Sequence, residues 1–200
     1  MTWGTTVKRL SFLFLVTGLM FCNVAHGSGL EVLTNLTSIE TNAVTDFQGL
    51  IGINMAAGDN HAQVNMHLID VGNTLQPGVI SQSTGNWEDV PGETMDCICA
   101  YAFQSSSGIV SINQAAGAGS AEANLVRIGY GADLPLDAAV LQQVVGSASQ
   151  ELKGENGAVW RADIISDHAF ENSRGIVQVN QSAGVANAVS NSMAINYKFQ

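Results

Sequence analysis

The amino-acid sequence predicts an all-β protein in which three repeated β-arc units stack as a short β-solenoid. The first observation is a segment of 21 residues that recurs three times without a gap, at 49–69, 108–128 and 175–195. The second is the alternation of polar and β-branched residues inside each copy, which is typical of a strand. The third is composition: 12% of residues are charged, 46% are hydrophobic and 21 are glycine, which argues against a coiled coil and against charge-driven disorder.

Residues 1–27 are expected to be a secretory signal peptide. Lys8 and Arg9 precede an apolar run that ends at Cys22, and small residues then precede a cleavage position at Ser28. The run is too short and too one-sided for a spanning helix, and no second run of spanning length follows. Lipidation at Cys22 is the alternative. The mature chain is therefore expected to be exported, without stable membrane insertion.

The remaining chain divides into three repeats and the segments between them. Upstream similarity extends the second and third copies, because Ile98 and Phe103 recur as Ile165 and Phe170; Phe47 is expected to take the same part in the first copy after a shorter turn. The expected segments are 28–42 (N-terminal segment), 43–69 (repeat 1), 70–94 (spacer), 95–128 (repeat 2), 129–161 (spacer), 162–195 (repeat 3) and 196–200 (C-terminal tail). Within the second spacer, the spacing of apolar residues predicts one short helix over Leu136–Val145.

Five columns of identical residues carry the expected function of the repeats. We expect glycine to serve the turns, asparagine to form ladders, and isoleucine and valine to fill the dry interior. The columns are Gly49, Gly108 and Gly175; Asn54, Asn113 and Asn180; Gly58, Gly117 and Gly184; Asn65, Asn124 and Asn191; and Ile69, Ile128 and Ile195.

Two interpretations of the asparagine columns remain open from the residues alone. Equivalent strands stacked about 4.8 Å apart would let each side-chain amide donate to the amide of the next unit. Alternatively, each asparagine caps a tight turn locally, and the repeats form an ordinary β-sandwich of duplicated hairpins. Because a buried amide without a partner is costly, the ladder requires units that stack in register.

These repeats resemble those of the Fap-type functional amyloids, and more distantly those of curli-like repeat proteins. The resemblance rests on the pattern Gly-Ile-Val-x-Val-Asn-x-Ser-Ala-Gly at 175–184, followed by alanine, asparagine and isoleucine, and on three imperfect repeats behind a secretory signal. It implies an amyloid-like solenoid, export from a Gram-negative bacterium through the periplasm and an outer-membrane pore with a periplasmic chaperone, and self-assembly with related subunits into biofilm fibres.

Cys97 and Cys99 lie mid-chain, two residues apart on an expected strand. Strand geometry would place their Cα atoms about 6.6 Å apart with parallel side chains, which suits a mutual disulfide poorly. The alternatives are a cross-link to another chain or a structural role, burial as thiols, and a metal or redox site.

Other chemistry finds little support in the residues. His61 and His67 occur in only one repeat, so we expect exposed strand residues and no metal site; Asp167 and His168 lack the spacing of a catalytic triad. The net charge of −10 disfavours nucleic acid as a partner. No enzyme activity and no cofactor are expected. The function predicted is a structural fibre subunit, and the alternative is a non-amyloid surface adhesin or an accessory or chaperone protein of a fibre secretion system.

Overall fold

The computed structural model describes residues 33–71, 79–85, 92–130, 140–144 and 160–197 of the chain. The expected signal peptide, with Cys22, lies outside these residues. All regular structure in the described residues is β-strand, as predicted, and no helix among them is long and apolar enough to cross a membrane.

Within the described residues, eleven strands form four parallel sheets. The strands are β1 (Leu33–Ile39), β2 (Gln48–Asp59), β3 (Ala62–Val71), β4 (Val79–Ser83), β5 (Gly92–Ile98), β6 (Ser107–Ala118), β7 (Ala121–Tyr130), β8 (Val140–Val144), β9 (Arg161–Ile165), β10 (Arg174–Val185) and β11 (Ala188–Tyr197). The sheet orders are β1-β5-β9, β2-β6-β10, β3-β7-β11 and β4-β8. Each of the three larger sheets therefore contains three strands that come from three different parts of the chain.

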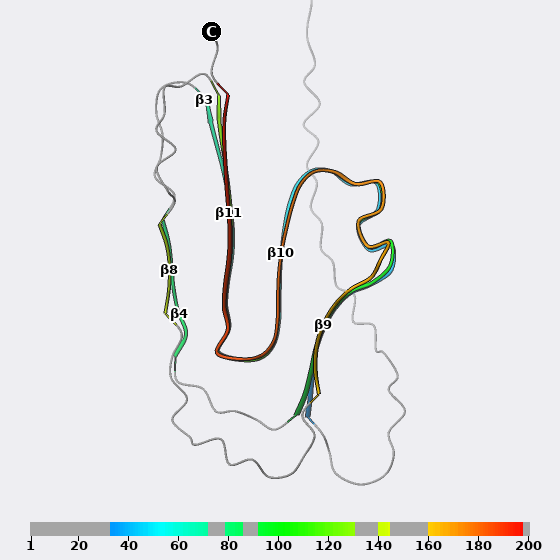
Figure 1. The fold of residues 1–200 in the computed structure, drawn as a ribbon, viewed down its shortest axis with the longest axis vertical. Coiled ribbons are helices and arrows are strands. Elements are labelled where there is room, and N and C mark those ends of the chain that lie inside the picture. The colour runs from blue at the N-terminus through cyan, green and yellow to red at the C-terminus, as the bar shows by residue number, and fades with distance from the viewer. Residues whose placement is uncertain (1–32, 72–78, 86–91, 131–139, 145–159, 198–200) are drawn as a thin grey trace, which may run out of the picture. The chain divides into compact units, whose positions relative to one another are not determined.

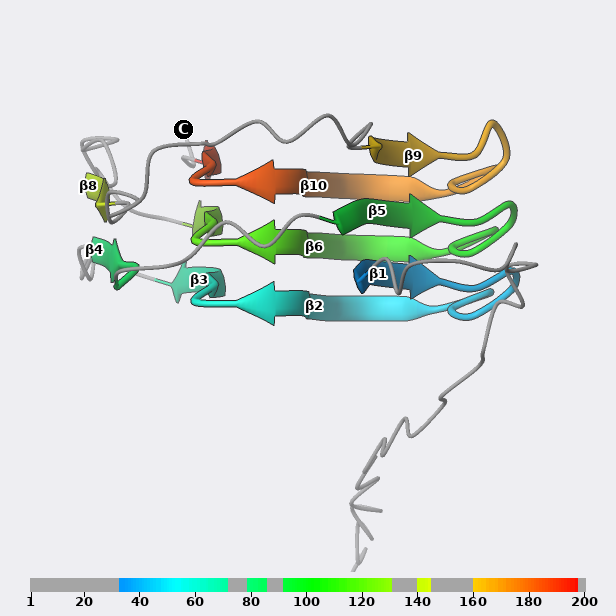
Figure 2. The ribbon, with the colours of Figure 1, turned by 90° about the horizontal axis from the view of Figure 1, so that it is seen from below.

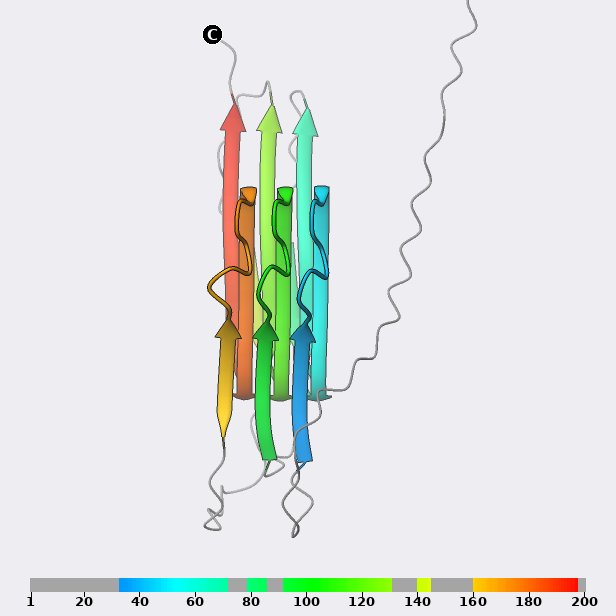
Figure 3. The same ribbon diagram turned by 90° about the vertical axis from the view of Figure 1, so that its right-hand side faces the viewer.

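The three copies lie on one another as rungs, and Figure 2 shows this stack from the side. We call β1–β3 the first rung, β5–β7 the second and β9–β11 the third. The pairing has no slip: Asn54 pairs with Asn113 and Asn113 with Asn180 in the Cα register. The edge-on view in Figure 3 shows equivalent strands side by side. The gapless repeat in the sequence thus becomes an in-register stack, which confirms the predicted solenoid.

Each rung doubles back twice, so that its three strands form three packed layers (Figure 1). The layer of β1, β5 and β9 packs on the layer of β2, β6 and β10 through Ile98, Phe103 and Ile112, all fully buried. Isoleucine and valine from the strand alternation fill this interface, as the sequence predicts. The other side of β2, β6 and β10 faces the layer of β3, β7 and β11. That second interface contains amide side chains.

The turn between the first two strands of a rung has the same length in every copy, so the expected role of Phe47 was wrong. Gln48 pairs with Ser107, and Val44 N donates to Ala102 O, which makes Val44 rather than Phe47 the counterpart of Phe103. The turn is fixed by backbone conformation: Asp46, Ser105 and Asn172 all have φ between 55° and 57°. Backbone geometry is therefore repeated even where side-chain identity is not.

The spacers add a fourth layer, and this corrects the expected helix at Leu136–Val145. Its described residues, 140–144, form strand β8, which pairs in parallel with β4. Val140 and Val144 are β-branched, and a partner strand far away in sequence outweighs the weak local preference for helix. From β4, Ile80 packs on Ala123 and Leu125, and so covers the outer face of β3 and β7.

The structural rung also begins upstream of the repeat that the sequence defines. Strand β1 lies in the segment 28–42, and it pairs with β5 over its whole length. Its sequence shares little identity with β5 and β9, so only the pairing reveals that the first rung contains three strands like the others.

Candidate self-assembly site

Two asparagine columns occupy the interface between the second and third layers. The β2-side column contains Asn54, Asn113 and Asn180, and the β3-side column contains Asn65, Asn124 and Asn191. Strand alternation points the side chains of the two columns toward each other. The amides of one rung therefore meet across the interface, where Asn124 Nδ2 donates to Asn113 Oδ1 at 2.9 Å. Asn113, Asn124 and Asn180 are at most 1% exposed.

Along each column, the amide of one rung donates to the amide of the rung before it. Asn113 Nδ2 lies 2.8 Å from Asn54 Oδ1, and Asn180 Nδ2 lies 2.9 Å from Asn113 Oδ1. In the other column, Asn124 Nδ2 lies 2.9 Å from Asn65 Oδ1. Every side chain of the two columns except Asn54 also donates to a backbone carbonyl of the facing layer, as Asn124 does at Ile112 O. The ladder interpretation is confirmed, and burial of these amides is stable because they are satisfied by stacking.

Glycine columns frame the second strand of every rung, and they act through close backbone approach. These glycines lie within the strands, with φ between 112° and 137°. A Cβ on Gly117 would stand 1.9 Å from Gly184 O in the next rung, and one on Gly108 would stand 1.9 Å from Gly49 O in the preceding rung. These glycines were expected in turns; they lie instead inside strands, where the close approach of neighbouring rungs excludes a side chain.

The fifth predicted column, of isoleucines, lies near the ends of β3, β7 and β11. Ile69 is 61% exposed and Ile195 is 44% exposed, so these two do not belong to the dry interior. Beside them, Tyr130 stacks on Tyr197 with ring centroids 5.7 Å apart, also largely exposed. The closing position of the repeat therefore forms an apolar ridge along the stack.

Two buried carboxyl groups in the second rung were missed by the sequence analysis. Glu122 is fully buried, and Gln63 Nε2 from the first rung donates to its Oε2 at 2.9 Å. Asp96 is also fully buried and accepts hydrogen bonds from Thr37 Oγ1 and Ser182 N. The sequence does indicate their burial, because strand alternation places both side chains on a face that points into the interior.

Burial shifts the ionisation of both groups. It raises the pKa of Glu122 to about 9, and the nearby Asp96 adds to this rise. It raises the pKa of Asp96 to about 6, although the hydrogen bonds from Thr37 and Ser182 favour the carboxylate. Glu122 is consequently a neutral acid inside the stack at pH 7.

This predicts that the stack is less stable as pH rises. An unfolded glutamic acid ionises near pH 4.5, whereas Glu122 in the fold keeps its proton up to about pH 9. Between these values stability falls by up to about 1.4 kcal/mol per pH unit, and below pH 4.5 the contribution is fully present. Glu122→Gln should flatten this dependence and stabilise the protein at pH 8, measured as denaturant midpoints from pH 4 to 9. Glu40→Gln, on an exposed side chain, is the matched control; equal pH profiles for wild type and Glu122→Gln would contradict the prediction.

Glutamine adds a shorter ladder. Gln181 Nε2 donates to Gln114 Oε1 at 3.0 Å, and Gln114 Nε2 reaches Cys97 O and Thr37 Oγ1. Met55 stands in the same column of the first rung, so the ladder ends there. The gapless repeat already aligns Gln114 with Gln181, but Met55 in the first copy breaks the identity of the column.

Cys97 and Cys99 lie closer together than regular strand geometry suggests. Their Sγ atoms are 3.5 Å apart, and Ser38 Oγ lies 3.7 Å from Cys99 Sγ. Both are half-buried thiols rather than a disulfide. Cys99 follows the last residue of β5, where the chain leaves the strand, so the two side chains can converge.

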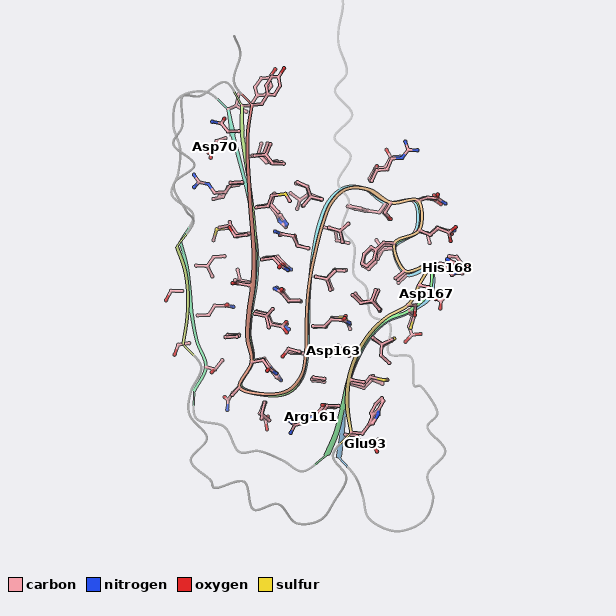
Figure 4. All side chains as sticks on the ribbon, in the orientation of Figure 1. Asp70, Glu93, Arg161, Asp163, Asp167 and His168 are labelled. Atoms are coloured by element: carbon pink, nitrogen blue, oxygen red, sulfur yellow. The ribbon has the colours of Figure 1, made fainter. Side chains whose placement is uncertain are left out.

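The histidines occupy separate structural positions. His67 and His61 are half-buried rather than exposed as expected: His67 Nε2 lies 2.9 Å from Ser111 Oγ, and Ser120 N donates to His61 Nδ1. Burial lowers the pKa of both. His168, in the turn after β9 (Figure 4), stacks on Tyr101 and contacts Glu171. Within the described parts of the chain, no three His, Cys, Asp or Glu side chains gather as a metal site.

The chain matches one model of a known protein family. The family model described as functional amyloid protein FapB/FapC family matches residues 22–198, which include all three rungs. No solved structure matches the chain.

Proposed function

Because this chain belongs to the functional amyloid FapB/FapC family, we propose that copies stack rung upon rung, third rung against first, to build an extracellular biofilm fibre. The family is structural, so the chain is a fibre subunit and not an enzyme. The residues proposed to mediate assembly are the asparagine and glycine columns described above. The predicted division of the chain into repeats and spacers is retained in this proposal, with β1 added to the first rung.

The single observation that carries this proposal is the pair of open edges at the two ends of the stack. Strands β2 and β10 each have 12 residues, lie at the edges of their sheet, and pair on one side only among the residues that the structure describes. Long flat edges of this kind are templates for another strand. In the second rung, residues from Val110 to Leu125 are buried by a neighbour on each side, whereas the end rungs are half-exposed. A second copy would complete each end rung.

We propose secretion of the chain on the same ground of family membership. Residues 1–27 would direct the chain to the periplasm of a Gram-negative bacterium, and a chaperone and an outer-membrane pore would pass the mature chain to the surface. An acidic chain with net charge −10 suits this route, since it resists association with anionic membrane surfaces during export. Cys97 and Cys99, half-buried, would remain accessible for a cross-link between fibre subunits.

The proposal predicts that purified residues 28–200 form fibres at neutral pH. Fibre diffraction should give a reflection near 4.7 Å from the rung spacing and one near 10 Å from the packed layers. Thioflavin T fluorescence should rise, and preformed fibres should remove the lag. A monomer that stays thioflavin-negative for weeks in the presence of seeds would contradict the fibre function and favour the adhesin alternative.

A further inference from the structure

We infer that the two ends of the stack are complementary to each other but not to themselves, so that copies add in one orientation only. We call the exposed edges of β1, β2 and β3 the first-rung face, and those of β9, β10 and β11 the third-rung face. The inference rests on the proposed fibre function and adds to it the polarity of growth and the residues that impose it.

The asparagine columns have a direction. In both columns, Nδ2 of a later rung donates to Oδ1 of the earlier rung, as in Asn180 to Asn113 and Asn113 to Asn54. Repetition of this pattern leaves the Nδ2 of Asn54 as an outward donor on the first-rung face. It leaves the Oδ1 of Asn180, which accepts only from Asn191 within the described residues, as an acceptor on the third-rung face. Donors thus meet acceptors only when unlike faces join.

The glycine columns are also directional, in opposite senses. A Cβ on Gly58 or Gly117 would point toward the next rung, whereas one on Gly108 or Gly175 would point toward the preceding rung. At the ends, a Cβ on Gly184 therefore points out of the third-rung face. A Cβ on Gly49 points out of the first-rung face. Neither meets backbone of its own chain, since the nearest atoms are Arg161 Nη1 at 3.3 Å and Phe47 Cζ at 3.8 Å.

The charges agree with joining of unlike faces. The described residues of the first rung carry four carboxylates and no lysine or arginine. If the register continues, each of these carboxylates meets an uncharged residue of the preceding third rung. The pairs are Glu40 with Ser166, Asp46 with Asn172, Asp59 with Val185, and Asp70 with Asn196.

The third rung follows the same rule. Its carboxylates at Asp163, Asp167 and Glu171 would each meet a threonine of the next copy, at Thr37, Thr41 and Thr45. Two first-rung faces placed together would instead bring carboxylates into proximity and set amide donors against donors. Like-on-like pairing is therefore disfavoured by both charge and hydrogen bonding.

This polarity can be tested by blocking one face at a time in residues 28–200. Gly184→Ala places a methyl group where Gly58 O of the next copy would stand, so it blocks the third-rung face. Gly49→Ala blocks the first-rung face at Gly175 O of the preceding copy. Each variant alone should remain monomeric in analytical ultracentrifugation. An equimolar mixture should form a closed dimer, through the free first-rung face of one variant and the free third-rung face of the other.

Asn54→Asp provides a second blocked first-rung face without a change at glycine. Its side chain still accepts from Asn65 and Asn113, so the fold of the single copy is kept, but the outward donor becomes a carboxylate. It should be monomeric alone at pH 7 and should dimerise with Gly184→Ala. Below about pH 4 the acid is protonated and fibre growth should return.

The outcomes separate this inference from the fibre function. Wild-type protein that forms no fibres contradicts the proposed function itself. If wild type forms fibres but a single blocked variant dimerises alone, like faces pair and the polarity is overturned. If wild type forms fibres and neither mixture dimerises, continuation of the internal register across copies is overturned.

Discussion

Gly117→Ala is expected to prevent the second and third rungs from stacking, and so to abolish both the folded unit and fibre growth. The added Cβ would lie 1.9 Å from Gly184 O and 2.8 Å from its carbonyl carbon, and these are backbone atoms that no rotamer change can move. A φ of +127° adds strain for any residue with a side chain. Together these effects should cost at least about 3 kcal/mol.

The measurement is the denaturant midpoint of the monomer together with the thioflavin T growth rate in the presence of wild-type seeds. Gly85→Ala is the matched control, because a Cβ there meets nothing within 4 Å. It should fold and grow like wild type. Wild-type growth by Gly117→Ala would mean that adjacent rungs do not approach as closely as described, and the glycine columns would then have no role in stacking.

Asn113→Asp is expected to be nearly as damaging at neutral pH. Asn113 is fully buried, and its Nδ2 serves Asn54 Oδ1 and Val64 O at 2.8 and 3.0 Å. A carboxylate can still accept from Asn124 and Asn180, but it can no longer donate to Asn54 Oδ1 or Val64 O, and it buries a charge. Loss of partners around a buried charge typically costs about 3–5 kcal/mol.

Low pH should rescue this variant, because protonation restores a neutral group that can donate one hydrogen bond. Seeded growth of Asn113→Asp, compared between pH 7 and pH 3, checks the prediction. Asn42→Asp is the control: it lies exposed in the turn after β1, with a φ of 59° that aspartate also tolerates, and no carboxylate faces it in the continued register. Equal growth of the two variants at pH 7 would mean that the ladder contributes little.

The repeat columns explain why so much of the architecture could be predicted from sequence. The five columns described above and two columns of alanine give seven identical positions in 21. With their gapless spacing, they leave in-register stacking as the arrangement that satisfies every asparagine at once. The alternation of Ile and Val with polar residues then assigns one side of β2, β6 and β10 to an apolar interface and the other to the amides. Fold class, strand pairs and ladders follow from such local regularity.

Features without a repeated signature were predicted less well. The helix expected at Leu136–Val145 proved to contain strand β8, and β1 was not recognised as part of the first rung. Ile69 and Ile195, expected in the interior, lie exposed near the ends of β3 and β11. In each case the environment of the residues depends on segments that are far away in the chain. A local sequence pattern does not show which segments these are.

By itself, the sequence determined that three equivalent units must stack, because columns of Asn and Gly require neighbours of the same kind. The tertiary structure alone decided the surroundings of single residues: the burial of Glu122 beside Gln63, the convergence of Cys97 and Cys99, and the opposite directions of the two glycine columns. The physical reason is that periodicity places a side chain on a face, whereas its partners, its desolvation and its pKa depend on the strands that fold back over that face.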